Sequence, residues 1–474
     1  MPLSAALRCK ILLAWLLGLA LVACGTKEAE VEDTARPHIV LVIADDLGFG
    51  DLEHFGGPER TPTLTGLAEQ GVTLDQFHAF PLCTPSRAAL MTGRSPLRDG
   101  LAWSPLRPWS ELGLAQEVET LPEILQGAGY YTALLGKWHL GHALADQHPR
   151  QHGFDHFYGF LTGAVDYFSH ESRDGGRDWQ RNGETVQETG YVTRLLTREA
   201  ESLIAEHDFE QPLFLMLSYS APHRPMQAPQ ETLAEMGAFT DPTERVYAAM
   251  LAEFDRGLAR VQTALDEQGV SDNTLWVFLS DNGAALQLGG SNGDLKGGKS
   301  AVTQGGLRVP AIVRWPGKLV AGRTSANFQT IQDIAPTLAG IAGTKFHDAI
   351  DGRDLSAHWL GKTTDVLPST PVAFVAHNEQ RGQMALIDWP WKYIRRMDRD
   401  GASIREQLFH LGEDPTESQN LIRDEGERAT RLREELARWI ALDPQQLSLD
   451  RLPAWQGDAP EMWKAPAAWA EAVR

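Results

Sequence analysis

Cys83 and Arg87 could together receive an anion, because residues four apart lie on the same face of a helix. The run that begins at Cys83 reads C-T-P-S-R-A-A-L-M-T-G-R. Pro85 fits the first turn of a helix, and Gly93 can end it. We therefore expect Cys83 at a helix N-terminus, where unpaired N–H groups and the helix dipole favour negative charge. For a lone cysteine, a buried structural role would be the better interpretation.

Hard oxygen donors follow two predicted strands and could hold a cation. Apolar runs at 39–43 and 275–279 lead into these four donors: Asp45, Asp46, Asp281 and Asn282. Adjacent carboxylates point to opposite faces of a strand, so the chain must leave the sheet at the aspartate pair if both serve one site. With no spare cysteine and no histidine adjacent to these motifs, the donors suit Ca²⁺ or Mg²⁺ better than zinc. Each motif alone is more often a loop feature.

Basic side chains that could face an anionic substrate occur in three further motifs. Lys137 and His139 belong to G-K-W-H-L-G, where a spacing of two projects both to one side of an extended segment. His223 occurs in A-P-H-R-P, and Lys299 in G-G-K. The remaining histidines near the second motif lack such a context, and we expect them at the surface: His142, His148, His152 and His156.

Together, these motifs resemble the type I sulfatases, an arylsulfatase-like family. C-x-P-S-R at Cys83, followed by L-x-T-G-R, is similar to the sequence in which the family's cysteine is oxidised to formylglycine (3-oxoalanine). The resemblance implies a formylglycine-generating enzyme as the maturation partner and a sulfated small molecule or glycan as the substrate. It also implies Ca²⁺, in preference to Mg²⁺, bound by Asp45, Asp46, the residue formed from Cys83, Asp281 and Asn282.

The resemblance further implies a role for each side chain in sulfate ester hydrolysis. Hydrated formylglycine attacks sulfur through one hydroxyl, whose proton passes to Asp281. His223, alone or with Lys299, protonates the departing alcohol, and His139 deprotonates the second hydroxyl so that sulfate leaves. The charge of the sulfuryl oxygens is spread by the cation and by Arg87, Lys137 and Lys299.

The resemblance covers nearly the whole chain after its N-terminal segment, with one departure. Gln304 precedes Gly305-Gly306 where the family usually has Glu, which puts supporting contacts in doubt rather than catalysis. The residues from Leu408 to Leu421 are similar to the family's C-terminal pattern. D-Y-F-S-H at 166–170 and G-S-N at 290–292 resemble the N-acetylgalactosamine-4-sulfatase (arylsulfatase B) branch, which implies a carbohydrate sulfate.

Two other functions compete with a sulfatase. A phosphate or phosphonate monoester hydrolase of the same alkaline-phosphatase-like superfamily can share the formylglycine motif, and rates on matched aryl sulfates and phosphates distinguish the two. A lipid-tethered glycan-binding pseudoenzyme would have lost catalytic groups. All six are present: Cys83, Arg87, Lys137, His139, His223 and Lys299.

The elements that must position these residues alternate along the chain. Strands are predicted at 39–43, 130–135, 213–217 and 275–279, and helices at 61–70, 193–207 and 244–268. Polar residues just past the strand ends are typical of a doubly wound α/β fold, whose ligands bind at that edge of the sheet. The resemblance implies the alkaline-phosphatase-like form, a large mixed sheet flanked by helices. We expect long irregular loops at 142–190.

The alternation fades after about residue 365. Short strands at 371–376, 384–387 and 391–395 and an amphipathic helix at 427–442 predict a small α+β domain. We therefore expect a catalytic domain at 37–365 and a small C-terminal domain with a terminal extension at 366–474.

Residues 1–23 predict an export signal, with a basic start followed by an apolar run that is too short to span a bilayer. Leu21-Val22-Ala23-Cys24 resembles the lipobox of bacterial lipoproteins, in which the cysteine is lipidated. Gly25 stands where an aspartate would retain such a protein in the inner membrane. We expect an exported protein anchored to a bacterial membrane, the outer membrane in particular. A plain secretory signal is the alternative.

Composition limits the partners further. Residues 24–36 are acidic and lack periodicity, so we expect a solvated tether. The net charge of −20 and the lack of a basic stripe argue against a nucleic-acid partner. Of the three cysteines, Cys9 would leave with the signal, Cys24 would be the anchor and Cys83 the site residue, so no pair remains for a disulfide.

Overall fold

The computed structural model describes residues 36–455 except 59, 364–367, 369 and 402. The predicted signal segment, the predicted tether up to residue 35 and the predicted boundary between residues 365 and 366 lie outside these residues. Within the described range, no helix combines the length and the hydropathy needed to cross a membrane.

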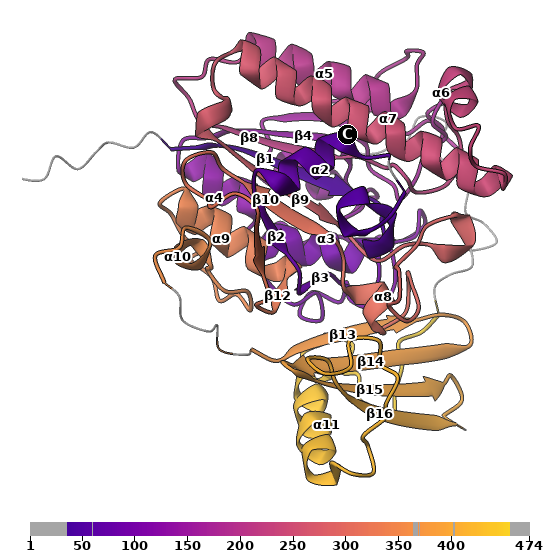
Figure 1. Cartoon of the computed structure of the whole chain (residues 1–474). Coiled ribbons are helices and arrows are strands. Elements are labelled where there is room, and N and C mark those ends of the chain that lie inside the picture. The colour runs from indigo at the N-terminus through magenta and orange to yellow at the C-terminus, as the bar shows by residue number, and fades with distance from the viewer. Residues whose placement is uncertain (1–35, 59, 364–367, 369, 402, 456–474) are drawn as a thin grey trace, which may run out of the picture. The chain divides into compact units, whose positions relative to one another are not determined.

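A ten-stranded mixed sheet underlies the larger part of the described chain (Figure 1). Its strands are, in spatial order, β11 (Arg323–Ser325), β2 (Val72–Leu74), β10 (Ala311–Arg314), β9 (Thr274–Ser280), β1 (His38–Ala44), β8 (Leu213–Ser218), β4 (Tyr131–Lys137), β5 (His156–Phe160), β6 (Gln180–Arg181) and β7 (Glu184–Thr185). The central strands β9, β1, β8, β4 and β5 are parallel, whereas β10 runs antiparallel to both neighbours. A short parallel pair joins β12 (Gln329–Thr330) to β3 (Phe77–His78). The predicted large mixed sheet is confirmed.

Helices cover both faces of this sheet. One core contains α2 (Pro62–Glu69), α5 (Val192–Glu206) and α7 (Pro242–Glu267), and the other contains α3 (Cys83–Thr92), α4 (Leu121–Gly127) and α9 (Ile334–Ile341). Strand β1 shows why the sequence is continuously apolar there. Val40 and Val42 face the first core, Ile39 and Leu41 face the second, and all four are fully buried.

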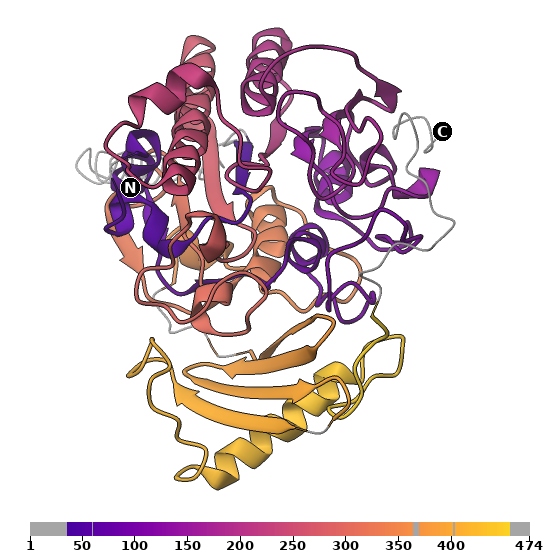
Figure 2. The same cartoon turned by 90° about the vertical axis from the view of Figure 1, so that its right-hand side faces the viewer.

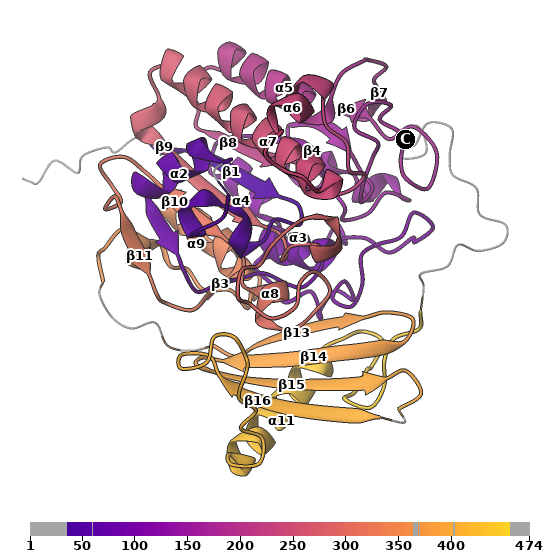
Figure 3. The ribbon, with the colours of Figure 1, turned by 45° about the vertical axis from the view of Figure 1, so that its right-hand side comes forward.

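Shorter helices connect these elements. They are α6 (Gln230–Glu235), α8 (Gln304–Leu307), α10 (Ser356–Trp359) and the 3₁₀ turns η1 (Phe49–Asp51), η2 (Glu53–Phe55), η3 (Ala145–Gln147), η4 (Pro149–Gln151), η5 (Ser271–Asn273), η6 (Leu286–Leu288) and η7 (Ile331–Asp333). Helix α8 lies beside the first strand of the C-terminal sheet in the views of Figure 1 and Figure 3. Its first residue contacts the C-terminal part of the chain, because the N–H of Gln304 donates to Oε2 of Glu417.

The C-terminal part is a four-stranded antiparallel sheet with one long helix. Its strands β13 (Val372–His377), β14 (Arg381–Asp388), β15 (Trp391–Asp398) and β16 (Ile404–His410) pair in chain order, and α11 (Gly426–Ile440) covers one face (Figure 2). The other face contributes Phe374 and Phe409 to the core that also contains α3 and α4. The predicted small α+β domain is confirmed, and β16 is an additional strand that was not predicted.

The region 142–190 is more ordered than predicted. Strands β5, β6 and β7 extend the large sheet there, so the expectation of irregular loops is wrong for these residues. The expectation of surface histidines is wrong for His142, His148 and His152, which are all buried. Packing against distant rings explains two of them, because His152 lies 5.6 Å from Trp138 and His148 lies 5.3 Å from Phe157 between ring centroids. Local sequence does not reveal such contacts.

Candidate active site

The carboxyl ends of the central parallel strands meet at one edge of the sheet, as expected for a doubly wound fold. Strand β1 ends at Ala44, and the chain then leaves the sheet because Asp46 adopts a left-handed conformation, with a φ of 68°. The N–H of Asp281, just past β9, donates to the carbonyl of Ala44 at 3.1 Å. The predicted donors from the two strands therefore converge.

Cys83 begins α3, and Leu82 before it is extended. Gly93 ends the helix in a left-handed conformation, as predicted. The Sγ of Cys83 lies 3.4 Å from Oδ1 of Asp45 and 3.5 Å from Nζ of Lys299. Burial, together with the carboxylates of Asp281 and Asp45, raises the pKa of the Cys83 thiol to about 12. The thiol is therefore protonated at neutral pH, and the carboxylates outweigh the helix N-terminus.

The buried side chain of Arg87 holds several site residues in position through hydrogen bonds. Its Nε donates to Oδ2 of Asp281 at 3.0 Å, and its Nη1 donates to Ser218 Oγ at 2.6 Å and to the carbonyl of Lys137 at 3.0 Å. Burial alone would lower the pKa of Arg87, but the charge of Asp281 raises it. Ser218, at the end of β8, was not predicted. Its place just past the apolar part of a strand was the available signal.

Four side chains offer ligand atoms that lie within 4.8 Å of one another: Asp45, Asp46, Cys83 and His223. The cluster overlaps the predicted metal set but includes His223 and leaves Asp281 and Asn282 beside it. Lys137 Nζ lies 2.6 Å from Oδ2 of Asp45, and Lys299 Nζ lies 2.6 Å from Oδ1 of Asp46. Burial opposes ionisation of Asp45, but Lys137 holds the pKa of that carboxyl low.

A hard divalent cation fits the residues at this edge. The Oδ1 atom of Asn282 is buried and accepts no hydrogen bond from the described residues, while its Nδ2 donates to Oδ1 of Asp46 at 2.7 Å. Burial and the charge of Asp45 raise the pKa of Asp281 to about 6, as expected where carboxylates are crowded. Carboxylate and amide oxygens are the ligands that Ca²⁺ and Mg²⁺ prefer. The buried amide oxygen and the crowded carboxylates match that preference.

His139 lies in the site, but with a backbone conformation that the sequence did not predict. Its φ of 62° excludes the extended segment that was expected from Lys137 to His139. The ring is held by a contact of 3.2 Å between Nε2 and the carbonyl of Leu106, and Gly163 leaves room for it, since a Cβ there would lie 2.7 Å from the ring. Burial and then Lys137 lower the pKa of His139 well below its usual value. The imidazole is therefore neutral.

His223 is the second buried histidine of the site. Its Nδ1 lies 2.6 Å from the carbonyl oxygen of Arg224, and its Nε2 lies 3.7 Å from Oδ2 of Asp46. Burial lowers the pKa of His223 to about 4, although Asp45 acts in the opposite direction. It too is neutral at pH 7.

A cavity of about 300 Å³ opens from this cluster. Of the six predicted catalytic residues, four line it: Cys83, His139, His223 and Lys299. Arg87 and Lys137 are fully buried behind them. The C-terminal sheet and the residues after α11 also contribute to the wall, through His377, Asn378 and Trp455.

Comparison with known proteins decides the family. The family model described as Sulfatase matches residues 37–344. The chain belongs to the sulfatase family. It is a sulfuric ester hydrolase with the alkaline-phosphatase-like fold of that family.

Several relatives show how far this similarity extends. Arylsulfatase J of Mus musculus is 36% identical over 337 residues, which is 69% of this chain and 56% of that protein. N-acetylgalactosamine-6-sulfatase of Mus musculus is 34% identical over 459 residues, covering 86% of this chain and 84% of that protein. The solved structure of Ps i-CgsB in complex with k-i-k-neocarrahexaose has a TM-score of 0.80 and 31% identity, covering 88% of this chain and 95% of that one.

Gln304 marks the point where this sulfatase departs from the expected motif. Its Oε1 lies 3.0 Å from Nε2 of His78, and its backbone N–H donates to Oε2 of Glu417 at 2.9 Å. Glu417 pairs with Lys392 at 2.7 Å, and both side chains are fully buried. The carboxylate next to Gln304 is therefore that of Glu417, which belongs to the C-terminal part of the chain and is paired with Lys392.

Proposed function

We propose that this sulfatase removes sulfate esters from a sulfated carbohydrate. The observation that carries the proposal is the cavity of about 300 Å³ beside Cys83, which has room for a sugar ring beyond the sulfate. The names of two relatives support it, since one is an N-acetylgalactosamine-6-sulfatase and the other was solved with k-i-k-neocarrahexaose.

The proposal includes oxidation of Cys83 to formylglycine by a formylglycine-generating enzyme. The C-T-P-S-R context supports it, as does the high pKa of the thiol, which makes the unmodified side chain a poor nucleophile at pH 7. A hydrated aldehyde supplies two hydroxyl groups on one carbon, one to attack sulfur and one to allow release of sulfate.

The proposal also includes a divalent cation, Ca²⁺ in preference to Mg²⁺. It would be held by Asp45, Asp46, residue 83, Asp281 and Asn282. A cation there would lower the pKa of the nucleophile and offset the charge of the sulfuryl oxygens. The buried Oδ1 of Asn282 supports this ligand set over one limited to the four clustered side chains.

The chain's own side chains divide the remaining work. Arg87, Lys137 and Lys299 are cationic and offset the charge of the sulfuryl group. Neutral His139 can accept a proton at its buried Nδ1 or exchange one through Nε2. His223 is neutral before substrate binds, and an anionic substrate beside it raises its pKa, so that it can then donate a proton to the leaving oxygen.

Initial rates on 4-nitrophenyl sulfate, 4-nitrophenyl phosphate and a matched phenylphosphonate ester test the reaction class. We expect the sulfate to be the fastest substrate. A phosphate or phosphonate ester that reacts faster would favour the related hydrolase activity instead. Release of inorganic sulfate from a panel of sulfated mono- and polysaccharides then tests the carbohydrate assignment, and sulfate release from aryl esters alone would contradict it.

We also propose that the protein is exported and anchored by a lipid on Cys24 to a bacterial membrane, in particular the outer membrane. The lipobox-like Leu21–Cys24 supports this. Wild-type protein should fractionate with membranes, and Cys24→Ala should be released into the soluble fraction. Equal partitioning of the two would contradict the anchor.

A further inference from the structure

We infer that the cavity beside Cys83 contains a second anion subsite, centred on Arg224, which binds a further anionic group of the substrate, a second sulfate ester or a carboxylate. The inference rests on the proposed carbohydrate substrate. It narrows that substrate to saccharides that carry at least two anionic groups.

The charge of the cavity wall is opposite to that of the chain. The protein has 63 acidic and 43 basic residues, for a net charge of −20. The wall of the cavity reverses this balance, with four cationic side chains and one carboxylate, and these are Arg107, Arg173, Arg224, Lys299 and Asp174. An acidic protein repels polyanions at long range, so a polyanionic substrate requires local positive charge where it binds.

Arg224 differs from the other cations of this wall in that its side chain has no partner among the described residues. Lys299 is paired with Asp46, and Arg173 lies 3.6 Å from Asp174. The exposed side chain of Arg224 makes no ion pair and no hydrogen bond within the part of the chain that the structure describes. Arginine in a binding site commonly recognises carboxylate or sulfate-like oxygens in a bidentate manner. Its guanidinium is therefore available to a ligand.

Arg224 directly follows His223, one of the predicted catalytic residues. Its carbonyl oxygen lies 2.6 Å from Nδ1 of His223, and Nε2 of the same ring lies 3.7 Å from Oδ2 of Asp46. The sulfate to be cleaved would meet Lys299 and the deeper cations Arg87 and Lys137, which are already committed to Asp281 and Asp45. Arg224 does not belong to these three cations. It can therefore bind a second anionic group of the substrate while they bind the sulfate that is cleaved.

Ligand binding in the Cys83→Ala background tests the subsite without turnover. The probes are N-acetylgalactosamine 6-sulfate, N-acetylgalactosamine 4,6-disulfate and a disaccharide of glucuronic acid and N-acetylgalactosamine 6-sulfate, measured by titration calorimetry at constant ionic strength. We expect one or both two-anion probes to bind about tenfold more tightly than the monosulfate. Preference for the disulfate identifies a second sulfate as the natural group, and preference for the uronate identifies a carboxylate.

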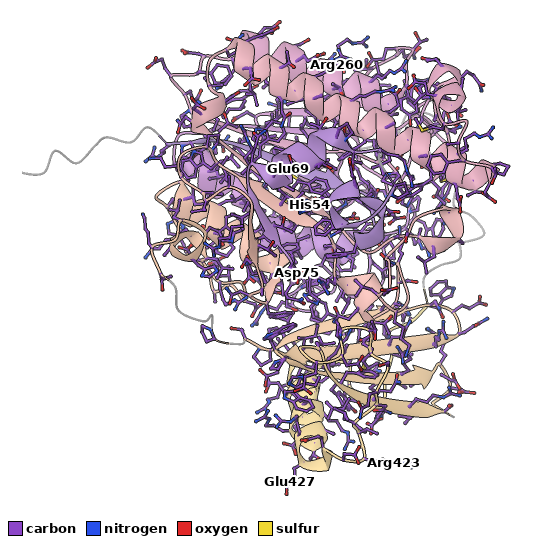
Figure 4. The ribbon with its side chains drawn as sticks, viewed as in Figure 1. His54, Glu69, Asp75, Arg260, Arg423 and Glu427 are labelled. Atoms are coloured by element: carbon purple, nitrogen blue, oxygen red, sulfur yellow. The ribbon has the colours of Figure 1, made fainter. Side chains whose placement is uncertain are left out.

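Variants assign the preference to Arg224. Arg224→Gln should abolish the preference and leave monosulfate binding unchanged, whereas Arg224→Lys should retain part of it. Arg423→Gln is the matched control, because Arg423 is also exposed and unpaired among the described residues but lies near α11, outside the cavity (Figure 4). It should behave as the parent protein.

Two results would overturn the subsite: no preference in the parent protein, or an equal loss for all three probes in Arg224→Gln. Sulfate release by the unsubstituted enzyme separates this from the proposed function. Equal kcat/KM on the mono- and disulfated sugars would keep the carbohydrate assignment and remove the subsite. No release from any sugar, with activity on the aryl sulfate, would remove the carbohydrate assignment and the subsite with it.

Discussion

Cys83 is buried beside the carboxylates of Asp45 and Asp281 and is protonated, yet it begins a helix whose N-terminus would favour an anion. Burial and the carboxylates dominate because the low dielectric of the interior strengthens charge interactions more than one helix end can offset. The unmodified thiol is therefore a poor nucleophile in this site, in agreement with the proposed oxidation of Cys83 to formylglycine.

The Cys83→Ser variant isolates the need for two hydroxyl groups on one carbon. Serine can still attack sulfur, but His139 would have no second hydroxyl to deprotonate. We expect the sulfated serine to accumulate, with turnover of 4-nitrophenyl sulfate lowered by at least a thousandfold. Mass spectrometry of the peptide around residue 83 should show the added sulfate. Turnover at the wild-type rate would rule out the two-hydroxyl mechanism for this protein.

Asn282→Ala tests the ligand set of the cation without breaking an ion pair. The variant removes a buried amide oxygen that has no described partner, together with the hydrogen bonds from Nδ2 to Asp46 and to the carbonyl of Gly283, and it leaves the ion pairs of Asp45 and Asp46 in place, so the fold should persist. We expect the affinity for Ca²⁺ to fall about tenfold or more, because affinity in oxygen-ligand sites depends on ligand number. Elemental analysis and calcium titration measure this. An unchanged affinity would remove Asn282 from the site.

Sequence motifs located the buried cluster well, because Asp45, Asp281 and Lys137 each stand just past a run of apolar residues that forms a central strand. They failed for Ser218, at the end of β8, and for the arginines of the cavity wall, because these arginines come from loops with no common spacing. His139 shows a further limit: the position of its ring depends on contacts with distant Leu106 and Gly163. Side chains whose position depends on tertiary contacts could not be predicted.

At the scale of elements, the C-terminal sheet holds the loop that carries Lys299. Lys296 Nζ donates to the carbonyl of Glu417 at 3.2 Å, and Gln383 Nε2 donates to the carbonyl of Ser300 at 3.2 Å. At the start of helix α8, the N–H of Gln304 donates to Oε2 of Glu417 at 2.9 Å. The C-terminal part thus supports the active site from outside the family's matched region.

The buried ion pair between Lys392 and Glu417 lies where the C-terminal part contacts helix α8. Losing one of the two charges should cost more stability than losing both. Glu417→Gln leaves the ammonium of Lys392 buried without a countercharge, which should lower the free energy of unfolding by about 3–5 kcal/mol. The double variant Glu417→Gln, Lys392→Met removes both charges and should recover most of this loss. Denaturant unfolding of the wild type, Glu417→Gln, Lys392→Met and the double variant measures it. Additive losses in the double variant would show that the two charges are not coupled.

Strands β1, β4, β8 and β9 were predictable to within one or two residues, since parallel strands buried on both faces form continuous apolar runs. Strand β16 was not, because its first half is exposed or half-buried and contains the polar run Arg405-Glu406-Gln407, as on a sheet edge. Strand β5 was missed because His156 and Gly159 interrupt its apolar pattern. A glycine in a strand marks close backbone approach, which only the neighbouring strand explains.

At the scale of the whole molecule, buried neutral histidines make stability depend on pH. Burial lowers the pKa of His78 to about 3 and that of His152 to about 4. Below pH 6.5 the unfolded chain protonates these rings while the folded chain does not. The unfolded state then binds more protons, so stability is complete above pH 6.5 and falls as the pH falls towards these lowered values.

His152→Phe tests this dependence at one residue. Phenylalanine preserves the contact with Trp138 and cannot be protonated. When the pH falls from 7.5 to 5, the free energy of unfolding should decrease by about 2 kcal/mol less in the variant than in the wild type. The difference arises because one proton bound only by the unfolded chain costs about 1.4 kcal/mol for each pH unit below 6.5. Urea unfolding at the two pH values gives the comparison. Equal losses in the two proteins would show that His152 is not held neutral.

The central claim is that turnover depends on conversion of Cys83, and one paired measurement tests it. Protein is produced with and without a formylglycine-generating enzyme, and the fraction of peptide carrying aldehyde at residue 83 is measured by mass spectrometry alongside sulfate release from 4-nitrophenyl sulfate. We predict that activity per molecule is proportional to the aldehyde fraction, with folded but inert protein at zero conversion. Full activity in protein that retains the Cys83 thiol would contradict the account.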